Sequence, residues 1–222
     1  MKLFEPLLAG GTLRERLIAS VGALVGIALT FTLCGSLPIA IVAPIGASAV
    51  LVFAVPASPL AQPWSVVGGN TLSALVGIAA FKLLPDAPLA AGLAVGGAIL
   101  VMSLCRCLHP PGGAAALTAV IGGPAVHAAG FGFALLPVAL NSVVLVLLGI
   151  ACHRLTRRAY PHRPAPTPAP GFHLADIDAA LADMDETFDI DRADLDALLT
   201  RAESHAAARH LRATAAPRRR PG

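Results

Sequence analysis

Long apolar segments separated by short breaks occupy the chain from residue 17 to residue 153. Only three charged side chains occur in this stretch, Lys82, Asp86 and Arg106, and none occurs from Leu17 to Phe81. A helix of about 20 apolar residues crosses a hydrocarbon core about 30 Å thick. The pattern therefore predicts an all-α fold, a polytopic helical membrane protein with some short or broken helices.

Breaks at Pro, Gly and polar clusters divide this stretch into six expected segments. They comprise residues 17–34, 39–55, 64–84, 88–105, 110–121 and 131–151. The fifth is short, because twelve residues of helix extend only about 18 Å. Basic residues precede the first segment and follow the last, so the positive-inside rule places both termini in the cytoplasm and requires an even number of crossings. We expect six crossings, or four if one of the segments is re-entrant.

An internal repeat supports a count of six. Three pairs of sites match at offsets of 67 to 71 residues: Gly22–Gly26 with Gly92–Gly96, Pro44–Ser48 with Pro111–Ala115, and Asn70 with Asn141. A unit of three segments repeated in tandem lies in the membrane in opposite orientations, as in many secondary transporters. Chance matching in a Gly- and Ala-rich sequence is the alternative. The small-residue stripes are also compatible with a homodimer.

The composition changes after the last apolar segment. We expect a membrane domain over residues 1–158, a Pro-rich linker over 159–172, amphipathic cytoplasmic helices over 173–213 and a basic disordered tail over 214–222. The expected helices hold ten of the 13 acidic residues of the chain, and Asp191 with Asp194 suits the start of the second one.

Proline and glycine interrupt the apolar pattern most strongly at residues 44–48 and 109–113, which occupy matching places in the two repeats. If each begins a half-helix, the positive dipole ends and bare first-turn amides would face each other and bind an anion without a buried cation. The expected substrate-binding residues are Pro44, Gly46, Ala47, Ser48, Asn70, His109, Pro110, Pro111, Gly112, Gly113 and Asn141, with Arg106 at the vestibule.

Each polar candidate has a simpler interpretation beside the functional one. Ser48, Asn70 and Asn141 offer hydrogen-bond donors, but intramembrane Asn and Ser also join helices. His109 could donate to a substrate or cap a helix, and Arg106 could attract anions or extend to lipid headgroups. Lys82 and Asp86, four residues apart, are simplest as a surface ion pair at the end of a segment.

Composition limits the remaining function classes. The chain is 56% hydrophobic and 13% charged, about half the charge of a soluble protein, and its formal net charge of +3 resides mostly at the two ends, so nucleic acid is a poor partner. A weaker alternative is a soft-metal transporter, because soft ligands gather at Met102, Cys105, Cys107 and His109. It is weaker because Cys105 and Cys107 are two residues apart and would point to different faces of a helix. No enzyme motif is found, and we expect neither catalysis nor a cofactor.

Three motifs in order give the chain a family resemblance. Residues 109–117 (HPPGGAAAL), 43–51 (APIGASAVL) and 58–63 (SPLAQP) resemble signatures of the HPP family of integral membrane proteins, over about residues 13–151. Gly113 and Ala115 stand where many members have Ala and Thr. The resemblance implies a membrane region usually described as four helices, and many bacterial members carry cystathionine-β-synthase-type regulatory domains after it.

The resemblance also implies a direction for function, because plant chloroplast members are regarded as nitrite carriers. Together with the two broken segments, it predicts a multi-pass bacterial inner-membrane carrier or channel for a small anion such as nitrite. The alternative is a membrane anchor whose acidic C-terminal helices recruit a soluble partner.

Overall fold

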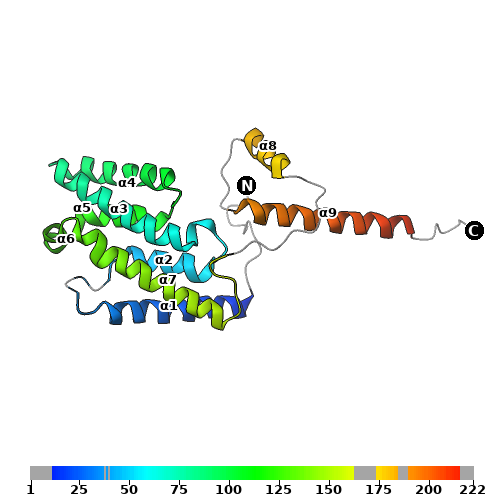
Figure 1. The fold of residues 1–222 in the computed structure, drawn as a ribbon, viewed down its shortest axis with the longest axis horizontal. Helices are drawn as coiled ribbons and strands as arrows, with labels where there is room; N and C mark the ends of the chain where they lie inside the picture. Colours follow the sequence, from blue (N-terminus) through cyan, green and yellow to red (C-terminus); the bar gives the residue numbers. More distant parts are fainter. Residues whose placement is uncertain (1–11, 38, 40, 163–173, 185–189, 216–222) are drawn as a thin grey trace, which may run out of the picture. The chain divides into compact units, whose positions relative to one another are not determined.

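The computed structural model describes residues 12–37, 39, 41–162, 174–184 and 190–215 (Figure 1). The chain divides into two compact units, residues 1–162 and 163–222, which are described separately. The first unit is the membrane unit. Most of the expected linker and nearly all of the expected basic tail lie outside the described residues.

Six principal helices build the membrane unit: α1 (Leu13–Leu33), α2 (Pro44–Ala54), α3 (Pro63–Leu83), α4 (Ala87–Leu104), α5 (Pro110–Ile121) and α7 (Leu140–Leu155). Three short elements complete it: η1 (Pro59–Ala61), α6 (Pro124–Ala129) and the π-helical η2 (Ala134–Ala139), which runs directly into α7. Proline occupies the first position of α2, α3 and α5, where its missing amide is not needed and its fixed φ suits the helix.

Four of these helices are long and apolar enough to cross a bilayer: α1, α3, α4 and the continuous η2–α7 segment, Ala134–Leu155. The shorter apolar helices α2 and α5 contain 11 and 12 residues, which extend about 16 and 18 Å. The expected class, an all-α polytopic membrane protein, is therefore confirmed. The number of crossings stays a prediction.

The helix contacts follow the pattern of a twofold repeat. We match α1, α2 and α3 of the first half to α4, α5 and α7 of the second, in that order. The α1–α2 contact then corresponds to the α4–α5 contact, and the α3–α4 contact corresponds to the α7–α1 contact. The α3–α5 contact corresponds to the α7–α2 contact. The remaining α2–α5 and α3–α7 contacts each correspond to themselves. The contact pattern therefore agrees with the repeat that the sequence predicts.

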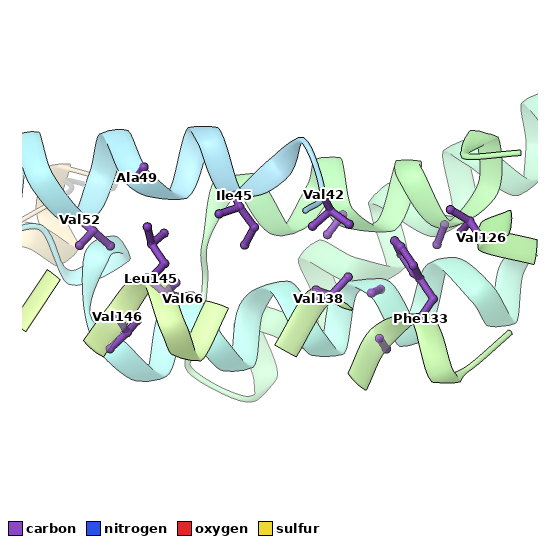
Figure 2. Packing of buried hydrophobic residues seen from close by; sticks show 14 of the residues in the cluster. Val42, Ile45, Ala49, Val52, Val66, Val126, Phe133, Val138, Leu145 and Val146 are labelled. Atoms are coloured by element: carbon purple, nitrogen blue, oxygen red, sulfur yellow. The ribbon is translucent and has the colours of Figure 1, made fainter. Parts of the chain in front are cut away.

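One apolar core joins α2, α3, α5 and α7. Ile45, Ala49 and Val52 follow one face of α2 at helical spacing and pack in the same buried cluster as Val66 of α3 and Leu145 of α7 (Figure 2). The cluster extends through η2 to Phe133 and Val126. The two short helices are therefore held inside the bundle rather than lying on its surface.

Glycines allow several of these helices to approach closely. A methyl group at Gly77 of α3 would meet the Ala116 carbonyl of α5. The ring of Phe53 from α2 packs against Gly22 and Gly26 of α1, so these glycines serve a contact within the chain. Gly92 and Gly96 of α4 face open space, and a homodimer stays a prediction.

Side-chain contacts show which helix ends lie together. Arg158 Nη2 is 3.2 Å from Glu15 Oε1, joining the end of α7 to the start of α1. The Tyr160 hydroxyl donates to the Ala61 carbonyl over 2.9 Å, and Trp64 Nε1 donates to the Cys105 carbonyl over 3.1 Å. One end of the bundle therefore holds the starts of α1 and α3 and the ends of α4 and α7. We call it the arginine end. It carries Arg14, Arg16, Arg106, Arg154, Arg157 and Arg158.

Lys82 lies in the last turn of α3 and Asp86 directly before α4, away from the arginine end, and the two do not form the expected ion pair. Asp86 instead caps α4, with its Oδ1 accepting the Leu89 amide hydrogen over 2.8 Å. Lys82 Nζ lies 5.9 Å from the centre of the Phe131 ring. A capping bond satisfies a helix-start amide that would otherwise lack a partner, and an exposed ion pair contributes little, so the cap is the better use of this carboxylate.

Among its described residues, 174–184 and 190–215, the second unit has two helices, α8 (Leu174–Met184) and α9 (Arg192–Ala215). Asp191 Oδ1 accepts the Ala193 amide hydrogen over 2.8 Å at the start of α9, as the sequence suggested. Arg192 Nη2 and Asp178 Oδ1 are 3.0 Å apart, and both side chains are exposed. Such an exposed pair adds at most about 1 kcal/mol.

Candidate functional site

The starts of the two short helices meet inside the membrane unit. Ser48 lies in the second turn of α2, and His109 is the residue directly before α5. Ser48 Oγ is 2.8 Å from His109 Nε2, although the residues are 61 apart in sequence, and both side chains are fully buried. The fold thus brings together the strongest candidates from the two broken segments.

The partners of His109 fix the direction of this hydrogen bond. Its Nδ1 is 2.7 Å from the carbonyl oxygen of Leu60 in η1. A carbonyl only accepts, so Nδ1 carries the hydrogen and Nε2 is the acceptor for the Ser48 hydroxyl. The Pro44 carbonyl, 3.2 Å from Ser48 Oγ, is a second acceptor within reach of the same hydroxyl.

Asn70 of α3 extends the hydrogen-bond chain across the bundle. Its Nδ2 donates to Ser48 Oγ over 3.0 Å and to Ser142 Oγ of α7 over 3.1 Å. Ser142 donates in turn to the Val138 carbonyl over 2.9 Å. Because both serine hydrogens are used elsewhere, the amide must present its NH₂ group to them. Ser48, Asn70, His109 and Ser142 are called the buried polar cluster below.

Two buried polar atoms on α3 have no partner among the described residues. They are Asn70 Oδ1 and, one turn further along, Ser73 Oγ. A methyl group at Gly112 of α5 would lie 2.7 Å from Ser73 Oγ, so this glycine lets α5 approach the hydroxyl. An unsatisfied buried polar group costs about 1–3 kcal/mol. The Ser73 hydroxyl could donate to an anion, whereas Asn70 Oδ1 only accepts and can gain only from a donor such as water.

The expected convergence of bare backbone amides is wrong. Three prolines, Pro44, Pro110 and Pro111, have no amide hydrogen at all. The amides of Ile45, Gly46 and Gly112 already donate to Val42, Ala43 and His109 carbonyls, over 3.0, 3.0 and 2.8 Å. These short-range bonds tighten the first turn and use the donors that a helix start would otherwise offer. Any substrate site here must depend on side chains.

Several predicted residues lie away from the buried polar cluster. Gly46 and Ala47 are exposed, and a methyl group at Gly46 would meet nothing within 4 Å. Pro110 is also exposed, whereas Pro111 and Gly112 are buried and Gly113 is intermediate. Asn141 is buried, but its Oδ1 accepts the Val42 amide hydrogen over 3.2 Å and so holds the segment that leads into α2. Their binding roles stay predictions.

Sequence reasoning missed Ser142, Ser73 and the Leu60 carbonyl. The two serines carry the same signal as Ser48, a polar residue within an apolar helix, but neither lies at a proline-broken segment. A main-chain carbonyl carries no sequence signal, because every residue has one. Only the fold shows that η1 points this one at His109.

A cavity of about 360 Å³ lies beside the cluster at the arginine end. Its lining comprises Pro59, Leu60, Ser65, Ser103, Arg106 and Leu108. Leu60 thus borders the cavity and also bonds His109. Arg106 is exposed and adopts a left-handed φ of 52° directly after α4. Its placement fits the vestibule role that the sequence suggested.

The soft-metal alternative stays a prediction. Cys105 is exposed and Cys107 is buried. In the described part of the chain, no three His, Cys, Asp or Glu side chains lie close enough to hold a metal ion.

The two halves of the repeat differ at the cluster. At the offset of 67 residues, His109 corresponds to Val42 and Ser48 corresponds to Ala115. Val42 and Ala115 are both buried in the apolar core cluster. The hydrogen-bonded pair therefore occurs once in the domain, and its counterpart is apolar.

Fold and site together define a polytopic helical membrane protein with a buried, uncharged polar centre. Residues 9–161 match the model of the HPP transmembrane region, and the chain belongs to this family. Two curated transmembrane proteins of Dictyostelium discoideum are similar, at 38% and 39% identity over 120 residues. These matches cover 52% of this chain and 42% and 38% of the relatives, so the chain spans less than half of their length. No solved structure matches the chain.

Proposed function

We propose that this chain carries a small monovalent anion, such as nitrite, across a bilayer, through the region where α2 and α5 begin. The observation that carries the proposal is the buried contact between Ser48 and His109, which joins the two short helices beside a cavity that Arg106 borders. The implied function of plant members of the family gives the substrate class.

The chemistry of the cluster suits an anion that must also leave. Its donors are two hydroxyls, an imidazole N–H and an amide, and it contains no charged side chain. Neutral donors can satisfy an anion, whereas a fixed buried cation would hold it strongly and would itself be costly in a membrane. Arg106 at the cavity would raise the local anion concentration.

A path follows from the order of these groups. An anion in the cavity would first meet Arg106 and then the segment around Leu60. To proceed, it would replace the Leu60 carbonyl as acceptor for His109 Nδ1–H and then accept from Ser48 and Asn70. We further propose that the arginine end faces the cytoplasm of a bacterial cell, in agreement with the positive-inside rule.

The test is nitrite uptake by proteoliposomes that contain the full chain. Ser48→Ala removes the hydroxyl that both donates to His109 and accepts from Asn70. We expect it to lower the uptake rate about tenfold, the effect of losing one buried hydrogen bond and leaving its partners unpaired.

Thr32→Ala is the matched control, because its exposed hydroxyl bonds only the Ala28 carbonyl one turn earlier on α1. It should transport like the parent chain. Uptake by the parent chain no faster than by empty vesicles would refute nitrite transport. Parent-like uptake by a folded Ser48→Ala variant would instead place the path elsewhere.

A further inference from the structure

An apolar groove follows the outside of the membrane unit between α1 and α7, which lie side by side (Figure 1). It has a volume of about 490 Å³ and an almost wholly apolar lining. Gly22 and Gly26 from α1, Cys152 from α7 and Phe53 from α2 contribute to its walls. The groove shares no residue with the buried polar cluster or with the Arg106 cavity.

The size of the groove fits one hydrocarbon chain. Its α1 wall extends from Leu17 to Leu29, a rise of about 18 Å. One leaflet of the bilayer core is about 15 Å thick, half of the total. The groove therefore follows α1 over the depth that the acyl chain of a single lipid occupies.

The groove ends at a cluster of arginines. Its lining residues Leu17, Leu155 and Thr156 are direct sequence neighbours of the basic residues at the start of α1 and the end of α7. These residues, called the basic rim, are Arg14, Arg16, Arg154, Arg157 and Arg158. Arg14, Arg16, Arg154 and Arg157 are exposed. The acidic residue described beside them is Glu15, which pairs with Arg158.

Backbone geometry directs the end of α7 toward α1. Arg157 adopts a left-handed φ of 57°, and the Arg158 amide donates back to the His153 carbonyl over 2.8 Å. This is the usual way in which a helix ends and reverses, but the left-handed residue is normally Gly. The turn places Arg158 against Glu15 and keeps the rim beside the groove.

We propose that the groove and the basic rim together bind one anionic glycerophospholipid. Its acyl chain lies in the groove and its phosphate binds the arginines, whose planar guanidinium groups match phosphate oxygens. Basic sites between transmembrane helices on the cytoplasmic side recognise anionic headgroups in this way. The net positive charge of the rim is the observation that selects an anionic lipid over a neutral one.

The same charge argues against a second copy of this chain in the groove. A twofold axis along the membrane normal would place two identical basic rims side by side. Like charges at close range repel, and the apolar groove offers no opposite charge to compensate them.

The test is native mass spectrometry of the full chain with phosphatidylglycerol or phosphatidylcholine of identical acyl chains. We expect the anionic lipid to bind about tenfold more tightly or better. Arg14→Gln combined with Arg157→Gln should weaken its binding roughly 25-fold, since each basic residue near a headgroup contributes about a factor of five. Val25→Trp, which fills the groove, should weaken the binding of both lipids.

Two variants serve as controls. Lys82→Gln removes an exposed positive charge away from the arginine end, and Leu100→Trp enlarges an exposed apolar side chain on α4. Both should bind lipid like the parent chain. Equal affinity for the two lipids, or no effect of the arginine substitutions, would overturn the proposal. A dimer that Val25→Trp dissociates, without lipid selectivity, would overturn it in favour of self-association.

Discussion

Both ring nitrogens of His109 are engaged inside an apolar bundle. Nδ1–H donates to the Leu60 carbonyl and Nε2 accepts from Ser48, which is the pattern of a neutral imidazole. The side chain therefore joins η1, α2 and the start of α5 without bringing a charge into the core. A substrate that competes for either nitrogen must break one of these links.

Tyr160 offers a test at the scale of a single residue, because the chain has only one tyrosine. Its hydroxyl is buried after the end of α7 and donates to Ala61, and burial raises the pKa of the phenol above its ordinary value. The native state therefore holds this proton at a pH where the unfolded chain has lost it. Stability from this source is complete below about pH 10 and is lost as the pH rises further.

The ultraviolet absorbance of tyrosinate should consequently appear only well above pH 10 in the native protein, and at about pH 10 after unfolding. Tyr160→Phe should abolish this part of the alkaline loss of thermal stability. A native-state titration that coincides with the unfolded one would show that the residue is open to solvent.

At the residue scale, sequence reasoning chose well where a side chain was unusual for its surroundings. Ser48, Asn70 and His109 are polar residues among apolar neighbours, and the fold brings all three together. Sequence reasoning failed at the backbone amides, because their hydrogen bonding depends on local main-chain geometry. The first-turn amides of α2 are occupied because the chain winds tightly there, and no residue type at these positions announces this.

At the scale of elements, the close contact of α3 and α5 depends on a small residue. A methyl group at Gly77 would meet the Ala116 main-chain carbonyl and lie 2.7 Å from Ala119 Cβ. Neither group can move without moving α5. We therefore expect Gly77→Ala to lower the free energy of unfolding by about 1–3 kcal/mol, the usual effect of overpacking, as measured by thermal unfolding in detergent.

Gly46→Ala is the control for this substitution. A methyl group there meets nothing within 4 Å, and alanine is the better helix former by about 1 kcal/mol. It should leave stability unchanged or slightly raised. Equal losses in the two variants would mean that glycine acts through chain flexibility and not through packing.

Helix positions were largely readable because prolines mark the starts. The first residues of α2, α3 and α5 are Pro44, Pro63 and Pro110. Pro44 begins the predicted break at 44–48, and Pro63 and Pro110 lie within one residue of the starts of the predicted segments 64–84 and 110–121. The last segment was less accurate. A single span over 131–151 was expected, but the structure has a π-helical piece from Ala134, with non-helical angles at Leu136, before α7. Apolar composition is the same on both sides of this break, but Pro137 is a sequence signal for it, because proline disrupts a helix and restricts the residue before it.

At the scale of the whole molecule, the division into two units allows a test of the anchor alternative. A chain that ends at His162 retains every described contact of the buried polar cluster. If transport is the function, this truncated chain should fold and take up nitrite at the parent rate in proteoliposomes. If the acidic helices recruit a partner, truncation should remove the biological function while the membrane unit stays intact.

At this scale the repeat stays a prediction, with which the contacts among the six principal helices agree. Matches between small residues are weak evidence individually, but their common offset of about 70 residues corresponds to a contact pattern in which each helix pair has its counterpart. The sequence comparison of the two halves did not predict which residues form the hydrogen-bonded pair. Sequence matching emphasises what the halves share, whereas the hydrogen-bonded pair is where they differ.

The Ser48 hydroxyl has two acceptors within reach, His109 Nε2 and the Pro44 carbonyl, and this affects what happens if the first is lost. When α5 withdraws His109, the serine can rotate its hydrogen to the Pro44 carbonyl of its own helix, 3.2 Å away. The beginning of α2 then remains fully bonded, and separating the two short helices does not leave a stranded donor in hydrocarbon. Loss of the contact to His109 would thus leave the Ser48 hydroxyl with an acceptor in its own helix.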